Sequence, residues 1–167
     1  MGVDEHRSKA PKSVTVAIVT VSDTRIVSDD FSGNAIADLL RTAGHKVGRR
    51  SLVKDEVQEI QKVLREAIED AGIDAVIING GTGIARRDVT LEAVSAFQEK
   101  AIPGFGELFR ALSYEEIGGA AMMSRAAAFV TEGKLVFCLP GLEKAVRLAV
   151  SKLIVPELGH AVWEARR

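Results

Sequence analysis

Residues 13–21 have the sequence SVTVAIVTV, and this stretch decides the fold class. It is rich in β-branched residues and almost wholly apolar, which is typical of a strand buried on both faces. Such strands occur in parallel sheets that carry helices on both sides, because the crossover connections place helices over each face. The flanking sequence should therefore alternate between helical and strand patterns.

The flanking sequence shows that alternation. Residues 32–43 carry apolar side chains at helical spacing and end at Gly44, and residues 57–68 repeat the pattern before Gly72. Further strands are expected at residues 46–53, 75–78 and 135–139. This order predicts an α/β fold, a three-layer sandwich with a mainly parallel central sheet.

The second half of the chain is less regular. Thr90 is expected to cap a helix, residues 107–112 to form one or two helical turns, and Ser113 with Glu116 to begin another short helix. A final helix is expected over about residues 143–163, bent near Pro156.

The bulk composition narrows the class of protein. The chain has 167 residues, of which 47% are hydrophobic and 27% charged, so it suits one globular domain. Its formal net charge of -1 gives no electrostatic attraction of the whole chain to nucleic acid or to a membrane surface. No apolar run is long enough to span a bilayer. We expect a disordered tail over residues 1–12, a single domain over residues 13–167, and a cytoplasmic location, the last because there is only one cysteine.

The strongest local signal for function is NGGTGIARRDVT, residues 79–90. In open α/β sheets, ligands bind outside the carboxyl ends of the strands, and this segment follows such a strand. Gly80, Gly81 and Gly83 allow a ligand close to the backbone, Thr82 adds a hydroxyl, and Arg86 and Arg87 can offset phosphate charge. The other interpretation is a tight turn with solvated arginines, and the glycines alone do not decide between the two.

Two carboxylates suggest a metal ion beside bound phosphates. Asp88 lies in the glycine segment and Asp55 ends the second strand. Magnesium is usually held by one or two carboxylates together with substrate phosphates. Each residue also has a purely structural interpretation, since acidic side chains stabilise the first turn of a helix. The three histidines show no ligand spacing, so a zinc site is not expected.

Other polar turns are candidates for binding an anionic ligand. They follow strands or join small-residue stretches, and each also has the plainer interpretation of a solvated loop or turn. The substrate-binding candidates outside the glycine segment are Ser22, Asp23, Asp30, Ser32, Gly33, Ser124, Arg125, Pro140 and Gly141. Cys138, inside an apolar strand, is expected to be a buried small hydrophobe.

Taken together, the motifs resemble one family. They follow one another in the order seen in the MoaB/Mog family of molybdenum cofactor biosynthesis proteins, which includes the G domain of gephyrin. The segments are TVSDTR (20–25), Asp30 with Ser32-Gly33, Val53 with Asp55, GGTGIARRDVT (80–90), IPGFGELFR (102–110), LSYEEIG (112–118), SRA (124–126) and LPG (139–141). IPGFGELFR with LSYEEIG makes the chain look closer to the MoaB branch.

The resemblance implies a molybdopterin-binding-domain-like fold, assembly into trimers or hexamers, and Mg-ATP-dependent adenylylation of molybdopterin. By motif, Asp55 and Asp88 are the essential carboxylates and the expected Mg²⁺ ligands. Residues 80–83 form the cradle, which the Ser124 and Pro140-Gly141 segments line. The alternative is a non-catalytic protein that binds or carries molybdopterin.

Three departures from the family pattern bear on that alternative. Leu91 stands where many relatives have proline and should be benign. Phe129 and Leu142 add bulk near the expected anion pocket, and Glu143 adds a negative charge there. The bulk of Phe129 and the charge of Glu143 favour binding without catalysis, whereas the presence of Asp55 and Asp88 favours the enzyme.

Overall fold

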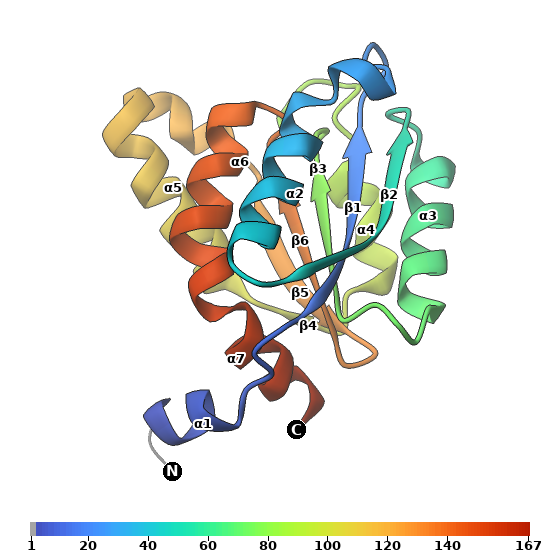
Figure 1. The fold of residues 1–167 in the computed structure, drawn as a ribbon. Helices are drawn as coiled ribbons and strands as arrows, with labels where there is room; N and C mark the ends of the chain where they lie inside the picture. The colour runs from blue at the N-terminus through green and yellow to red at the C-terminus, as the bar shows by residue number, and fades with distance from the viewer. Residues whose placement is uncertain (1–2) are drawn as a thin grey trace.

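The structure is a computed structural model of the chain and describes residues 3–167 (Figure 1). Six strands form one sheet in the order β2-β1-β3-β6-β5-β4. The strands are β1 (Thr15–Val21), β2 (Lys46–Val53), β3 (Ala75–Asn79), β4 (Lys100–Ala101), β5 (Ala127–Thr131) and β6 (Lys134–Leu139). β2, β1, β3 and β6 are parallel to one another. At the edge of the sheet beyond β6, β5 pairs antiparallel with β6, and β4 pairs antiparallel with β5. The predicted fold class is confirmed.

Helices cover both faces of this sheet (Figure 1). They are α1 (Val3–Lys9), α2 (Phe31–Thr42), α3 (Val57–Glu69), α4 (Thr90–Val94), α5 (Pro103–Ile117), α6 (Glu143–Ala149) and α7 (Val155–Arg166). On β1, Val16 and Ile18 face the core under α2, α5, α6 and α7, and Ala17 and Val19 face the core under α3 and α4. This period-two alternation explains why the strand must be apolar on both faces.

Three expectations for the second half of the chain were wrong. The two short helices expected around residues 107–116 are one helix, α5, which begins at Pro103 because proline suits the first helical turn. Thr90 does not cap α4, since its hydroxyl donates to the carbonyl of Gly80 at 2.8 Å. The antiparallel strands β4 and β5 were missed. Glu132 and Gly133 join β5 to β6 with positive φ angles of 47° and 71°, as in a tight hairpin turn.

The expected bend in the last helix takes a specific form. A π-helical turn over Val150–Ile154 separates α6 from α7 just before Pro156. Proline has no N–H to donate to the preceding turn, so the helical hydrogen-bond pattern must change there.

The N-terminal segment also differs from expectation. Residues 1–12 were expected to be a disordered tail; residues 1 and 2 lie outside the described part, but Val3–Lys9 form the helix α1. The Arg7 guanidinium pairs with Glu157 on α7, and the space beside Gly159 is filled by the carbonyl of Pro11. These contacts give the segment a docking place that its composition did not reveal. Within residues 3–167, no helix has both the length and the apolarity needed to cross a membrane.

Candidate functional site

The site is set by the register of the four parallel strands. Val21 on β1 lies opposite Val53 on β2, and Asn79 on β3 lies between Thr20 on β1 and Leu139 on β6. The strands therefore end level with one another. The turns that follow these strands therefore lie together at the carboxyl ends of the strands, as expected for this fold. They contain Ser22-Asp23, Asp55, Gly80–Gly83 and Pro140-Gly141.

The glycine loop, residues 80–83, is in direct contact with the turns beside it. Gly80 and Gly81 have φ angles of 102° and 67°, which side chains rarely adopt. A Cβ on Gly80 would lie 2.1 Å from the carbonyl oxygen of Val21, and a Cβ on Gly141 would lie 3.2 Å from the Cα of Gly80. The three turns are therefore packed backbone against backbone, which only glycine permits.

Asp55 and Asp88 lie against this loop. A Cβ on Gly81 would come within 3.1 Å of Asp55 Oδ1, and a Cβ on Gly83 within 2.7 Å of Asp88 Oδ2. Asp88 Oδ2 also accepts a hydrogen bond from the Ala85 N–H at 2.9 Å. The two carboxylates proposed from the sequence are thus brought to the same short segment of backbone, one at each end.

The electrostatic environment of Asp55 is negative. Partial burial raises the pKa of the Asp55 carboxyl above its usual value, and the charges of Asp23 and Asp88 raise it further. The pKa of Asp23 is lowered instead, chiefly because Arg87 donates hydrogen bonds of 2.9 Å to both of its oxygens. Asp23 Oδ1 also accepts the Asp55 N–H at 3.1 Å. A cation beside Asp55 would offset this concentration of negative charge.

The available side-chain donors fit magnesium better than a metal ion that takes all of its ligands from the protein. Within residues 3–167, no three His, Cys, Asp or Glu side chains are grouped closely enough to hold a metal ion. A magnesium ion would need only one or two carboxylates from the protein, because it commonly completes its octahedral shell with water and substrate phosphates. Asp55 and Asp88 are the residues that would hold it.

Arg125 forms hydrogen bonds with the glycine loop near Gly83. Its Nε donates to the carbonyl of Gly83 at 2.8 Å, its Nη2 donates to the carbonyl of Asp88 at 3.0 Å, and its guanidinium pairs with Glu92. Its backbone N–H donates to the carbonyl of Thr82 at 3.0 Å. Arg125 therefore holds the loop in place through protein contacts. Ser124 precedes it, and its hydroxyl accepts the Ala126 N–H at 3.4 Å.

The arginines at the outer side of the loop differ in their surroundings. Arg87 is held by Asp23 and also donates to Glu56 at 3.1 Å. Arg86 is exposed and borders a shallow depression of about 380 Å³. This depression is lined by Ile84, Ala85, Arg86, Asp88, Val89, Glu92 and Arg125.

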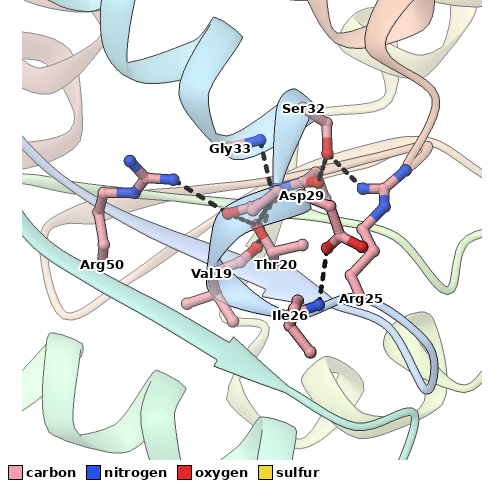
Figure 2. A network of polar contacts seen from close by, with 10 residues as sticks. Val19, Thr20, Arg25, Ile26, Asp29, Ser32, Gly33 and Arg50 are labelled. Atoms are coloured by element: carbon pink, nitrogen blue, oxygen red, sulfur yellow. Dashed lines mark hydrogen bonds and ion pairs between the residues drawn. The ribbon is translucent and has the colours of Figure 1, made fainter.

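A buried polar network lies beneath the first turn (Figure 2). The carboxylate of Asp30, only 4% exposed, accepts hydrogen bonds of 3.0 Å from the hydroxyl of Thr20, the N–H of Gly33 and the guanidinium of Arg50. The hydroxyl of Ser32 donates to Asn79 Oδ1 at 2.7 Å. Asp30, Ser32 and Gly33, expected from the sequence as ligand contacts, are thus in protein contacts under the site.

Four members of this network, Thr20, Arg25, Arg50 and Asn79, were not among the site residues predicted from the sequence. Asn79 is fully buried, and its amide Nδ2 donates to the carbonyl of Val19 at 3.2 Å and to the hydroxyl of Thr20 at 3.0 Å. Arg25 donates to Ser32 and to the carbonyl of Gly141. In the sequence, both residues stand out only as parts of the segments TVSDTR (20–25) and NGGTGIARRDVT (79–90). Their position was a further signal, since a polar residue at the carboxyl end of a buried strand, or just beyond it, is placed to meet its counterparts on neighbouring strands.

The bulky and acidic departures from the family pattern have different surroundings in the structure. Phe129 is 1% exposed and packs in the core under α3 and α4 with Val136 and Cys138. Glu143 pairs with Arg147 at 2.9 Å, one turn further along α6. Leu142 is 67% exposed at the surface. Phe129 therefore belongs to the core rather than to the anion pocket near which it was expected.

Known proteins resemble this chain in both sequence and structure. The model of a family described as a probable molybdopterin binding domain matches residues 17–160. The molybdenum cofactor biosynthesis protein B of Bacillus cereus is 51% identical over 168 residues, which cover 100% of this chain and 99% of that protein.

Solved structures agree with this match. A crystal structure of a molybdenum cofactor biosynthesis protein B superimposes with a TM-score of 0.91 and 52% identity, covering 95% of this chain and 99% of the other. The tungsten cofactor synthesizing protein MoaB from Pyrococcus furiosus superimposes with a TM-score of 0.86 and 37% identity, covering 95% of this chain and 100% of that one.

Proposed function

This chain belongs to the molybdopterin binding domain family that its motifs predicted and takes part in molybdenum cofactor biosynthesis, and we propose that it adenylylates molybdopterin with Mg-ATP. The observation that carries this proposal is the placement of the Asp55 and Asp88 carboxylates against Gly81 and Gly83. A backbone open to phosphate and two carboxylates able to hold a cation are thereby combined in one place.

The proposed reaction is a phosphoryl-type transfer that needs no nucleophile from the protein. An oxygen of the molybdopterin phosphate attacks the α-phosphorus of ATP, a new P–O bond forms, and pyrophosphate leaves as the bond between the α- and β-phosphates breaks. The protein has to align two anions and reduce the repulsion between them. The backbone N–H groups of residues 81–83 and the nearby, exposed Arg86 would serve that role, since the Gly80 N–H already donates to Leu139.

The carboxylates would act through magnesium. Asp55 and Asp88 would hold the magnesium ion, and the chemistry that the ion would supply is positive charge to offset that of the phosphates. The Asp88 carboxylate is held by the Ala85 N–H, and the backbone of Asp55 is held by the hydrogen bond from its N–H to Asp23. Fixed ligands limit the reorganisation needed when the charged substrates bind.

The test is an assay of purified protein with molybdopterin, ATP and magnesium that follows adenylyl-molybdopterin and pyrophosphate. We expect Asp88→Asn to reduce turnover by roughly 100-fold or more, as removal of one electrostatic contact commonly does. Asp38→Asn, which changes an exposed carboxylate on α2, is the matched control and should be unaffected. Unchanged turnover in Asp88→Asn would contradict the carboxylate assignment.

The same assay distinguishes the alternative function. A non-catalytic molybdopterin carrier would bind molybdopterin and form no product. The observation that favours this alternative is Glu143, whose negative charge lies two residues after Gly141 at the edge of the site. Its pairing with Arg147 reduces that charge locally, so the adenylyltransferase remains our proposal.

A further inference from the structure

Arg25 lies where three parts of the site meet. Its Nη1 donates to the hydroxyl of Ser32 at the start of α2 at 2.5 Å, and its Nη2 donates to the carbonyl of Gly141 after β6 at 2.7 Å. Its own backbone N–H donates to the hydroxyl of Ser22, just after β1, at 3.2 Å. Figure 2 shows the guanidinium beside Ser32. The half-buried side chain of Arg25 thus links the turn after β6 to the first turn of α2, while its backbone N–H holds it to the turn after β1.

Arg25 contacts the turn after β6 where that turn packs on the glycine loop. Gly141 lies against Gly80, and a Cβ on Gly141 would be 4.0 Å from Arg25 Nη1. Gly80 is itself held to β6 by a hydrogen bond of 2.9 Å from its N–H to the carbonyl of Leu139. The guanidinium is therefore beside the point where the glycine loop meets the turn after β6.

The Arg25 bonds also continue into the buried network. Ser32, which accepts from Arg25, donates in turn to Asn79 Oδ1 at 2.7 Å, and Asn79 immediately precedes Gly80. Arg25 is consequently linked to the glycine loop in two ways, through Gly141, which packs on Gly80, and through Ser32 and Asn79, which precedes Gly80. Hydrogen bonds from a charged donor are stronger than neutral ones, which suits a link between two turns.

We propose that Arg25 is a positioning residue, which holds the turn after β6 against the glycine loop so that the molybdopterin site is formed before the ligand arrives. This proposal rests on the proposed function, since it names what the positioned backbone is for. A preformed site binds more tightly because the ligand does not have to order the loops. Loss of the link should therefore weaken binding of molybdopterin.

The planar guanidinium is essential to this role, and its charge is not sufficient. Two separate nitrogens reach Ser32 and Gly141, which lie on different elements. A lysine keeps the positive charge but presents a single ammonium, so it cannot reproduce the forked geometry. If Arg25 served only as a positive charge near an anion, lysine would replace it. If it positions the turns, lysine should fail much as glutamine does.

The experiment compares Arg25→Lys and Arg25→Gln with the wild type and with Arg166→Gln. Arg166 is a matched control because it is a paired arginine on α7 whose partner, Asp74, immediately precedes β3 at the opposite end of the strands from the glycine loop. Calorimetric titration with molybdopterin gives both the Kd and the fraction of competent protein. Hydrogen exchange of the Gly80 amide, measured without ligand, reports the packing of the loop directly.

We expect the Kd to rise roughly tenfold or more in both Arg25 variants, equivalent to about 1.4 kcal/mol, with the competent fraction unchanged. The Gly80 amide should exchange faster in both, and Arg166→Gln should match the wild type. A loss of competent protein at unchanged Kd would mean that Arg25 only stabilises the fold, and wild-type behaviour of Arg25→Lys would mean that only its charge matters; either result overturns the proposal.

The two proposals fail in different ways. If the wild type does not bind molybdopterin, the proposed function is wrong, and with it the ligand named here. Gly80 exchange then decides the positioning role alone: faster exchange in both Arg25 variants supports it, and unchanged exchange overturns it.

Discussion

Replacing Gly80 with alanine should destabilise the fold far more than the same change at Gly104. Gly80 joins β3 to the glycine loop with a φ of 102°, and its absent side chain is what allows the loop to pack on β1. Gly104 lies in the first turn of α5, where a Cβ would meet nothing within 4 Å. The two sites differ in the space and the backbone angle available to a methyl group.

The magnitude follows from three effects at Gly80. A non-glycine residue at this φ is strained by about 1–3 kcal/mol. The new Cβ would lie 2.1 Å from the Val21 carbonyl oxygen, so β3 or β1 must shift. That shift weakens the hydrogen bond from the Gly80 N–H to Leu139, and a buried donor left without a partner costs about 1–3 kcal/mol more. We expect a loss of about 2–6 kcal/mol, a large part of the ~5–15 kcal/mol that stabilises a typical domain.

Urea unfolding followed by circular dichroism measures this loss as a shift in the free energy of unfolding. Gly104→Ala is the control, and it should be neutral or stabilising by up to about 1 kcal/mol, because alanine is favoured over glycine in a helix. Light scattering of each variant confirms that the assembly state is the same. A Gly80→Ala protein within about 0.5 kcal/mol of the wild type would refute the close packing of Gly80 on Val21.

Three further predictions test the electrostatics, the core and the assembly. The pKa of Asp55 is raised in the fold, so its stabilising contribution is complete below the unfolded pKa near 3.8 and is lost as the pH rises through the folded value. At pH 7 without magnesium, Asp55→Asn should therefore raise the free energy of unfolding by less than about 1 kcal/mol, since water screens this partly exposed group. At pH 3 the substitution should leave the free energy of unfolding unchanged. Equal effects at both pH values in urea titrations would contradict this prediction. Burial raises the pKa of the Cys138 thiol to about 12, so a thiol reagent at pH 8 should label only unfolded protein, and rapid labelling of folded protein would show that β6 is exposed. Three apolar side chains are each more than half exposed, those of Tyr114, Ile117 and Met122, and we expect them to form a subunit interface. Light scattering should therefore give a trimer or hexamer that Ile117→Glu dissociates. A monomeric wild type would show that this surface is not an interface.

The parts of the fold that were predicted from the sequence depend on local patterns. β1 was identified because each of its faces is buried, which makes the alternation of the strand apolar throughout. β5 was missed because its small residues, AAFVT, carry no comparable pattern. Its strand structure depends on pairing with β6, and the turn that permits this pairing includes Glu132, a residue type with no special preference for positive φ.

The candidate site divides in the same way. Asp55 and Asp88 could be placed together because both follow parallel strands, whose ends lie at one edge of the sheet. Arg25 could not be assigned a partner, since its contacts with Ser32 and Gly141 span 7 and 116 residues of chain. Contacts of that range depend on the completed fold, which the local sequence does not contain.

The arginines show a further limit of inference from residue type. Arg87 and Arg125 were expected to meet phosphate, and both are instead paired with carboxylates, Asp23 and Glu92. A carboxylate and a phosphate offer an arginine the same kind of oxygen acceptor, so the sequence cannot tell which of them the arginine will bind. The glycines carry no such ambiguity. What Gly80 and Gly81 require is the absence of a Cβ at a positive φ, and that requirement is met by one residue type whichever ligand the loop receives.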